Sequence, residues 1–391
     1  MLEILVGRKV FAAAAALSAA MVAAIGCSRP DPVTEKQSAL TVPVPPITQF
    51  AVFASRNMSF DDRTRVTSGS VGVQPGATNT LTAGIDTHIS EGQVMLSPRV
   101  VLRDRASTGE IGTNSFTPGA GNVTGPVSAY VAPPPQPTPG TITPGTTAVT
   151  VPLNGTRTLA PGAYGAVLLN NNATLTLSGG LYQFTSLTVN VEARVTVLAA
   201  TTVRVSGNVT GLDRSRFLPT GAVNASGFRL IVGGATNAVT LGNDVQMNAL
   251  LVARGDVRVG DRYIFNGAIA GRDVIIGHDC RINFVAGTGF QCANNANCND
   301  NNTCTTDVCG DAICTHTSLA NGTTCNDGNA CTRTDRCSNA VCVGSNPVTC
   351  VALDQCHDPG VCAPATGLCS NPNKPNGTTC SDNNACTAPD A

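Results

Sequence analysis

The chain contains no tryptophan, and charged residues make up only 13% of its 391 positions. The formal net charge at pH 7 is −1, with both signs scattered along the sequence. This balance predicts no basic stripe, so we expect no nucleic-acid partner. Apolar residues at helical spacing are missing after the N-terminus, which argues against a doubly wound sheet or a (β/α)8 barrel.

Chain-breaking residues, in contrast, are abundant, with 40 glycines and 24 prolines. A repeat of 17 or 18 residues lies among them, with copies that begin at Leu241, Val259 and Ile276. Each copy opens with an apolar residue and Gly, and reaches an apolar residue and Asn six positions later. A unit this short cannot bury its own apolar face, so successive units must stack. We therefore expect an all-β chain with a right-handed β-solenoid of 17–20 residues per coil, followed by small disulfide-rich repeats.

Stacking of the copies brings equivalent polar residues into columns. The two columns are Asp244, Arg262 and Asp279, and Asn248, Asn266 and Asn283. Opposite charges on neighbouring strands attract each other, and stacked amides hydrogen-bond to one another. Because the charges compensate, we interpret both columns as structural ladders. The alternative is a catalytic or calcium site like that of β-helix polysaccharide lyases, which use stacked carboxylates and an arginine.

Two further residues of the repeat are candidates for chemistry. Cys280 follows Val245 and Tyr263 in an inward column, which predicts a buried free thiol. His278 has no evident partner for acyl transfer, so we expect it to be a surface histidine.

Solenoid signals also occur earlier in the chain. Phe60-Asp-Asp-Arg63 and Leu102-Arg-Asp-Arg105 match Val259-Gly-Asp-Arg262, so residues 48–115 form a first solenoid block. Residues 116–147 are rich in Pro and Gly and predict a linker, or a loop strapped across the solenoid. Residues 148–287 then form the main solenoid, with a small insertion at 210–227.

The N-terminus has the layout of an export signal. Arg8 and Lys9 precede an apolar run at residues 10–25, and residues 1–26 are the expected signal peptide. Ala24-Ile-Gly-Cys27 resembles the lipobox of bacterial lipoproteins, which implies that Cys27 is lipidated. Ser28 is not acidic, which favours the outer membrane or cell surface. The proline-rich residues 27–47 predict an extended tether.

Cysteine is concentrated in residues 288–391. The disulfide candidates are Cys292, Cys298, Cys304, Cys309, Cys314, Cys325, Cys331, Cys337, Cys342, Cys350, Cys356, Cys362, Cys369, Cys380 and Cys386. Four cysteines per unit of roughly 27 residues predict two bridges standing in for a core that so short a unit cannot build. Their pairing stays open, and no Cys-x-x-Cys spacing supports zinc. The odd number of cysteines and the incomplete last unit predict that the array continues beyond Ala391.

The cysteine units share acidic and amide residues before their second cysteine. These are Asp300, Asn302, Asp327, Asn329, Asp382 and Asn384. They are candidate Ca²⁺ ligands through side-chain oxygens, and Asx turns account for them equally well without metal. The stretch Asn299-Asp-Asn-Asn-Thr-Cys304 and its copies resemble the slime-mould-type Cys-rich repeat, which also occurs in surface proteins of myxobacteria.

The solenoid itself resembles two families. Its hexad rhythm, Leu241, Met247, Ala253, Val259 and Phe265, is similar to bactofilin-type polymers and left-handed hexapeptide helices. Pro161-Gly-Ala-Tyr164 also resembles bacterial ice-binding-type solenoids, whose function implies regular Thr-x-Thr rows. Only Thr174-Leu-Thr176 fits such a row, with Thr196 above it, which argues against antifreeze activity.

No nucleophile, acid–base pair or cofactor motif accompanies these features. We therefore expect a non-enzymatic, lipid-anchored cell-surface protein without a cofactor other than candidate Ca²⁺. It would act as a spacer or adhesion module that contacts polysaccharide, matrix or other surface proteins. The alternatives are a carbohydrate-active, lyase-like β-helix and a bactofilin-like polymer. For the polymer, we expect the Pro-rich entry and Cys-rich exit to block the solenoid ends.

Overall fold

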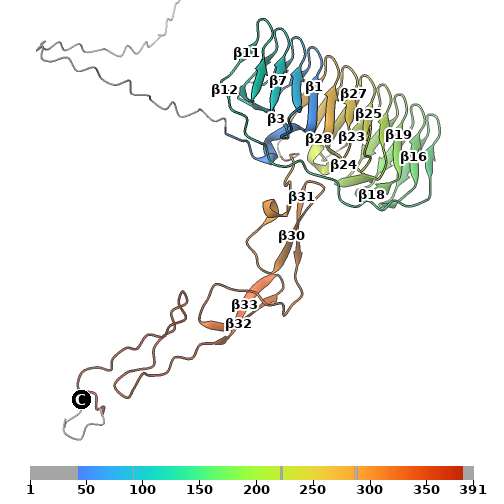
Figure 1. The fold of residues 1–391 in the computed structure, drawn as a ribbon. Helices are drawn as coiled ribbons and strands as arrows, with labels where there is room; N and C mark the ends of the chain where they lie inside the picture. The colour runs from blue at the N-terminus through green and yellow to red at the C-terminus, as the bar shows by residue number, and fades with distance from the viewer. Residues whose placement is uncertain (1–42, 91, 221–222, 286, 288, 382–391) are drawn as a thin grey trace, which may run out of the picture. The chain divides into compact units, whose positions relative to one another are not determined.

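The computed structural model describes residues 43–381 apart from 91, 221–222, 286 and 288. The described chain is all-β: a solenoid of stacked parallel strands, followed by a disulfide-bonded region (Figure 1). This confirms the fold class expected from the repeat. The signal peptide, Cys27, Asp382, Asn384 and Cys386 lie outside the described residues.

The solenoid has three faces, each a column of parallel strands. In stacking order, face A contains β13 (Val149–Val151), β16 (Ala166–Leu169), β19 (Ser186–Val189), β22 (Val209–Gly211), β25 (Val239–Leu241), β27 (Val257–Val259), the end of β28 (Ile264–Ile276), the end of β1 (Phe50–Phe60), β4 (Thr80–Ala83), β7 (Arg99–Leu102) and β10 (Ser115–Thr117).

Face B contains the strands that carry the Thr-x-Thr and apolar-Asn motifs. They are β14 (Thr156–Leu159), β17 (Thr174–Leu177), β20 (Arg194–Val197), β23 (Arg216–Pro219), the start of β26 (Gln246–Ala253), the start of β28, β29 (Arg281–Asn283), β2 (Arg65–Val66), β5 (His88–Ile89), β8 (Ser107–Thr108) and β11 (Val123–Thr124).

Face C closes each coil. It contains β15 (Gly162–Ala163), β18 (Gly180–Phe184), β21 (Thr201–Val205), β24 (Phe228–Val232), the end of β26, the middle of β28, the start of β1, β3 (Ser70–Val73), β6 (Val94–Leu96), β9 (Glu110–Gly112) and β12 (Val127–Ser128). The short 3-10 helices η1 (Ile47–Gln49) and η2 (Ala225–Gly227) flank strands of this face.

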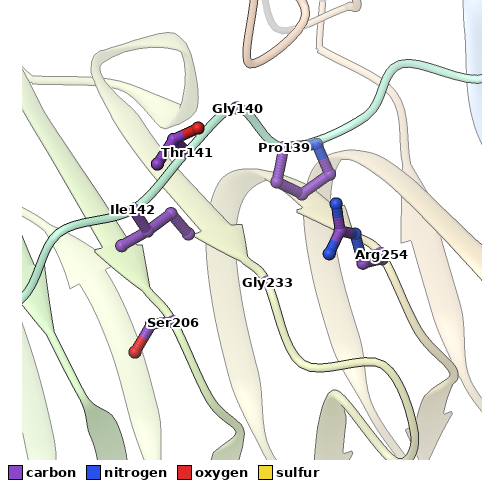
Figure 2. A pocket seen from close by; sticks show the side chains of 7 residues that line it. All are labelled: Pro139, Gly140, Thr141, Ile142, Ser206, Gly233 and Arg254. Carbon is purple, nitrogen blue, oxygen red and sulfur yellow. The ribbon is translucent and has the colours of Figure 1, made fainter.

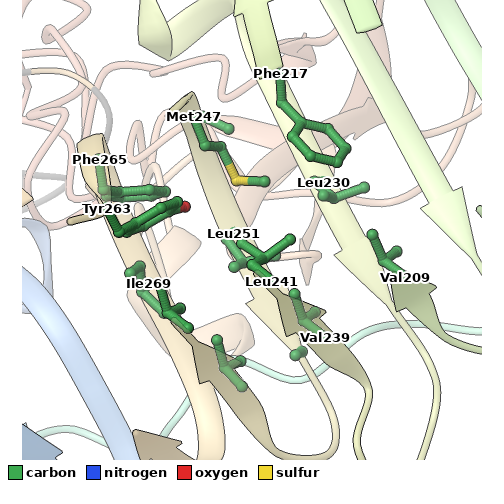
Figure 3. Packing of buried hydrophobic residues seen from close by; sticks show 14 of the residues in the cluster. Val209, Phe217, Leu230, Val239, Leu241, Met247, Leu251, Tyr263, Phe265 and Ile269 are labelled. Carbon is green, nitrogen blue, oxygen red and sulfur yellow. The ribbon is translucent and has the colours of Figure 1, made fainter. Parts of the chain in front are cut away.

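The core forms because alternate residues of each strand point inward. In β17 and β20 the buried residues are Leu175, Leu177, Val195 and Val197, while Thr and Arg alternate outward. Figure 3 shows other apolar side chains of this core, such as Phe217, Met247 and Phe265, on neighbouring strands of the stack. The period of two along each strand therefore fixes which residues remain on the surface.

The two solenoid blocks do not stack in the order of the chain. β1 pairs in parallel with β28, in the register Val52 to Ile269 and Phe60 to Ile276. The first block therefore stacks on the last coil of the main block (Figure 1). Consequently the free ends of the stack are formed by residues 149–163 and 115–128. Among the described residues no strand pairs with the outer edges of these end coils.

This topology corrects the expectation that the tether and the cysteine array cover the solenoid ends. Both the entry at Phe50 and the exit at Asn283 lie at the junction of the two blocks, because β1 pairs with β28 and β2 with β29. The argument that these segments block end-to-end stacking therefore no longer holds.

Residues 129–148, which we call the strap, connect the two blocks along the stack. The Tyr130 hydroxyl donates to the Val73 carbonyl, Gln136 Nε2 to the Ala253 carbonyl, and the Thr143 backbone N–H to Gln183 Oε1. Of the two alternatives for this segment, the structure has the strapped loop. It begins later than residue 116, because β10, β11 and β12 add one more coil to the first block.

The expected insertion at 210–227 is also shorter than predicted. Val209–Gly211 and Arg216–Pro219 are regular rungs on faces A and B. Only the following residues, which include η2, depart from the strand pattern.

The described part of the cysteine-rich region contains two antiparallel hairpins. They are β30 (Thr305–Gly310) with β31 (Ile313–Ser318), and β32 (Thr332–Ser338) with β33 (Val341–Pro347), preceded by η3 (Asn295–Cys298). Seven disulfides join its described cysteines. The pairs are 292–309, 298–314, 304–337, 325–342, 331–362, 350–369 and 356–380. Each complete unit thus closes one bridge on itself and shares another with the next unit, so the predicted two bridges per unit are not both internal.

Candidate functional site

The residues of the Asp244 column occupy one turn position along the solenoid, between faces A and B. In stacking order this charge column contains Asn154, Asn172, Glu192, Arg214, Asp244, Arg262, Asp279, Arg63, Asp86 and Arg105. All have φ between 55° and 61°, the left-handed region that side chains other than Gly seldom adopt. Their backbone N–H groups donate to carbonyls of the neighbouring coil, which fixes this turn in every rung.

Charges alternate along this column and pair two by two. Arg262 Nε lies 2.7 Å from Asp244 Oδ1, and Arg63 Nε lies 2.6 Å from Asp279 Oδ1. Arg214 with Glu192 and Arg105 with Asp86 repeat the arrangement at 2.7 Å. Hydrogen bonds from the paired guanidinium groups hold the pKa values of Asp244, Asp279 and Asp86 below the ordinary range. The Arg63–Asp279 pair crosses the junction, so the column continues from one block into the other.

At several of these turns the residue before the charged residue also links neighbouring coils. Asp213 Oδ1 accepts the Asn243 N–H, Asn243 Oδ1 accepts the Asp261 N–H, and Asp261 Oδ1 accepts the His278 N–H, at 2.8–2.9 Å. His278 is exposed, and its Nδ1 lies 3.2 Å from Asp261 Oδ1, a partner that the sequence did not suggest. Backbone donation from His278 is the main cause that lowers the pKa of Asp261. These carboxylates are thus occupied by backbone donors.

The asparagine column forms a continuous amide chain. Asn266 Nδ2 donates to Asn248 Oδ1 at 2.6 Å, and Asn283 Nδ2 donates to Asn266 Oδ1 at 2.8 Å. Across the junction, the Thr67 hydroxyl donates to Asn283 Oδ1 at 2.5 Å. The amides are therefore used in joining rungs, including the rung that joins the two blocks.

In addition to Arg63–Asp279, a second ion pair crosses the junction between β1 and β28. Arg56 forms a salt bridge with Asp273, whose side chain is only 11% exposed. Burial raises the pKa of Asp273, but hydrogen bonds from Arg56 and Asn57 outweigh it and leave the pKa below its ordinary range. Arg272 pairs with Asp256 one rung away at 2.8 Å.

Cys280 lies in the core as a free thiol beneath the charge column. Its Sγ lies 3.2 Å from the Gly260 carbonyl oxygen, and burial raises the pKa of the thiol to about 11. The neighbouring Tyr263 is fully buried, and its hydroxyl has no hydrogen-bond partner among the described residues. Neither group is placed to act on a molecule outside the core.

The outward residues of face B differ from one end of the solenoid to the other. Thr158, Thr176 and Thr196 lie in register on successive rungs, beside Thr156 and Thr174. The threonine columns then end. They are followed in register by Arg194, Arg216, Gln246, Ile264, Arg281 and Arg65, a set that we call the basic row. The sequence predicted no basic stripe, because these arginines are far apart in the chain and become neighbours only through the stack.

Two depressions accompany these surfaces. A groove of ≈ 360 Å³ is lined by Asn172, Thr174, Glu192, Arg194, Arg214 and Arg216. A second, of ≈ 450 Å³, lies between the strap and the strands of face C and is lined by Pro139, Gly140, Thr141, Ile142, Ser206, Gly233 and Arg254 (Figure 2). Arg254 is the only charged residue that lines this second depression.

The candidate calcium residues of the cysteine units form Asx turns. Asp300 Oδ1 accepts the Asn302 N–H at 2.8 Å, and Asn302 Oδ1 accepts the Cys304 N–H at 3.0 Å. Asp327 and Asn329 repeat these two bonds in the next unit. In the first unit His316 Nδ1 also lies 2.9 Å from Asp307 and 3.4 Å from Asp300. One oxygen of each Asp therefore accepts a backbone N–H within the turn.

Comparison with known proteins gives limited matches. No protein-family model matches the chain. It is 36% identical to protein psiR of Dictyostelium discoideum over 93 residues, which are 24% of this chain and 7% of that protein. The chain therefore spans a small fraction of the length of this relative.

Two solved structures resemble the chain at 14% sequence identity. An ice-binding protein from an Antarctic biological consortium is matched over 63% of this chain and 94% of its own, with a TM-score of 0.31. A glycosylated ice-binding protein from an Arctic yeast is matched over 61% and 92%, with a TM-score of 0.29.

None of the helices in the described part of the chain is long and apolar enough to cross a membrane.

Proposed function

We propose that this chain is a non-enzymatic, exported surface protein whose solenoid presents binding faces and whose cysteine units form a covalently linked array. The observation that carries the proposal is the occupation of the carboxylates in the charge column and of Asp213 and Asp261. Those in the charge column pair with arginine, and Asp213 and Asp261 accept backbone N–H groups. A hydrolase or lyase needs acidic or basic groups that are free to act on substrate.

The seven disulfides support export, because such bonds form and persist in oxidising compartments. Anchoring through a lipid on Cys27, in the outer membrane or at the cell surface, is the further part of the proposal. In a bacterial host, we expect metabolic labelling with a fatty acid to mark the full chain but not a Cys27→Ala variant. Labelling of both forms would contradict the anchor.

The direct test of the non-enzymatic function is a depolymerisation screen. The purified protein is incubated with acidic and neutral polysaccharides, with and without calcium, and the product length is followed by size-exclusion chromatography. We expect polymer length to stay unchanged in every case. Shortening of a polymer that is prevented in an Asp244→Asn or Asp279→Asn variant would instead support the lyase-like alternative.

Calcium binding by the cysteine units stays a prediction. The residues that would hold the ion are Asp300 and Asn302 in one unit and Asp327 and Asn329 in the next, through the oxygens that the Asx turns leave free. Titration calorimetry with CaCl₂ measures it, and an Asp327→Asn variant should lose one site. Absence of any binding heat would leave the turns as purely structural.

A second candidate function is binding to ice through the threonine columns. The observation that favours it is the register of Thr156, Thr158, Thr174, Thr176 and Thr196 on three successive rungs of face B. Inhibition of ice recrystallisation by the protein, lost in a Thr158→Tyr/Thr176→Tyr variant but kept in a Thr240→Tyr variant of face A, would support it. Absence of inhibition by the unaltered protein would exclude it.

A further inference from the structure

Among the surfaces of the solenoid, the basic row of face B departs from the way this protein arranges charge. At several places on the stack an arginine faces a carboxylate on the next rung, as Arg262 faces Asp244 and Arg272 faces Asp256. In the basic row Arg194 lies directly beside Arg216, and Arg281 beside Arg65. Like charges opposite each other on neighbouring strands repel and destabilise the sheet.

None of these four arginines has a carboxylate within ion-pair distance among the described residues. Arg281 Nε reaches only the neutral amide oxygen of Asn283, at 3.2 Å. Arg65, Arg194 and Arg281 are exposed, and Arg216 is partly exposed. The guanidinium groups thus retain donors for an anion from solution.

The groove at the Arg194 end gives the row a shaped site. Its lining contains three arginines, Arg194, Arg214 and Arg216, against one acid, Glu192, which Arg214 already pairs at 2.7 Å. Asn172 and Thr174 add neutral hydrogen-bonding groups. The lining therefore carries a positive excess together with polar groups suited to hydroxyls.

The geometry of the row selects an extended ligand. Successive rungs lie about 4.8 Å apart, so the basic row is a straight line of regularly spaced positions. The charge column on one side is internally neutralised, and the column of Asn248, Asn266 and Asn283 on the other side is uncharged. Anionic groups repeated along a linear polymer would meet two pairs of adjacent arginines along this row.

The chemistry favours a polysaccharide over a nucleic acid. Proteins that bind single-stranded nucleic acid stack bases on aromatic side chains, and the row has no Phe, Tyr or Trp. Arginine forms bidentate hydrogen bonds with carboxylates. Asn172 and Thr174, in the groove at the Arg194 end, match sugar hydroxyls.

We propose that the basic row of face B binds a linear acidic polysaccharide, with its carboxylate groups on the Arg194–Arg216 and Arg281–Arg65 pairs. This assignment rests on the proposed non-enzymatic surface function and names the class of ligand for it.

The test measures binding of the full-length protein to immobilised polygalacturonate at several NaCl concentrations. An Arg194→Gln/Arg216→Gln variant should bind at least about tenfold more weakly, with a smaller dependence on salt, because two cationic contacts are lost. An Arg65→Gln/Arg281→Gln variant should weaken binding in the same way from the other half of the row. Thermal melts of each variant establish that it folds.

The matched control is Arg99→Gln/Arg258→Gln, which removes the same charge from exposed positions on β7 and β27 of face A. It should bind like the unaltered protein. Equal loss in the control, no loss in either row variant, no binding of polygalacturonate, or tighter binding of duplex DNA than of polygalacturonate would each overturn the assignment. None of these binding results would contradict the non-enzymatic function. That function is contradicted only by degradation of a polymer.

Discussion

At the scale of single residues, two buried tyrosine hydroxyls of the solenoid differ in hydrogen bonding. One bonds a neighbouring coil, and the other has no partner among the described residues. The Tyr182 hydroxyl is buried but donates to the Leu159 carbonyl at 2.9 Å. The Tyr263 hydroxyl is equally buried and has no partner among the described residues. Burial of an unpaired hydroxyl costs free energy that burial of a paired one does not.

This contrast predicts opposite effects of the same substitution. Tyr263→Phe should raise the free energy of unfolding by about 1–2 kcal/mol, because it removes an unsatisfied buried group. Tyr182→Phe should lower it by about 1 kcal/mol, because it removes the hydroxyl that donates to the Leu159 carbonyl and accepts the Ser178 N–H. Urea denaturation followed by circular dichroism measures both, and a destabilised Tyr263→Phe protein would contradict the structure around that hydroxyl.

Cys280 gives a second prediction at this scale. Only the thiolate reacts with disulfide reagents, and burial raises the pKa of this thiol to about 11. In the native protein at pH 8, the unaltered chain and a Cys280→Ala variant should therefore show the same reactivity toward dithionitrobenzoate. In denaturant the unaltered chain should release one equivalent more. A difference in the native state would show that the thiol is accessible.

At the scale of strands and hairpins, the sequence predicted the coils of the solenoid but not the order in which they stack. The apolar-Gly to apolar-Asn repeat from Leu241 to Asn283 predicts both the rungs and the columns that join them. It could not predict that β1 follows β28, because every coil presents the same kind of unpaired edge and the same inward apolar residues. What distinguishes this edge is complementary charge, Arg63 for Asp279 and Arg56 for Asp273, between residues that are distant in the chain.

The junction should therefore respond to acid. The pKa values of Asp273 and Asp279 lie below the ordinary value near 4, so both carboxylates stabilise the folded state above about pH 4. Their contribution is lost as pH falls through the lowered values. We expect hydrogen exchange of β1 to accelerate as pH drops below about 4, after correction for intrinsic rates. An Asp273→Asn variant should exchange faster at pH 7 and change less with pH; identical pH profiles would contradict a role for this pair.

The bridges between cysteine units were beyond sequence analysis, since spacing alone leaves the pairing open. Cys304–Cys337 closes a loop with a sequence separation of 33 and joins the first two units. Such a loop contributes about 3–4 kcal/mol in the chain-entropy model. A Cys304→Ser/Cys337→Ser variant should be cleaved by thermolysin at Leu319, between the units, much faster than the unaltered protein. Non-reducing peptide mapping that finds Cys304 bonded inside its own unit would contradict the array.

At the scale of the whole molecule, the strap lets two blocks that are consecutive in sequence stack in the opposite order. The strap hydrogen-bonds to the coil of Val73, the coil of Ala253 and the coil of Gln183, so it passes the junction on its way to the far end. The order of the blocks determines the surfaces as well. Arg281 and Arg65 are neighbours only because the blocks meet there, and the basic row would be interrupted in a stack that followed the chain.

The most direct test of this account is a pair of engineered cross-links, mapped by mass spectrometry after mild oxidation. Ser59 and Ile275 are register partners on neighbouring strands across the junction, so Ser59→Cys/Ile275→Cys should form a disulfide. Thr117 and Thr150 lie on the outermost rungs of face A, where a stack in chain order would place them together, so Thr117→Cys/Thr150→Cys should not. A bridge between positions 117 and 150, with none between 59 and 275, would contradict the discontinuous solenoid and the basic row that depends on it.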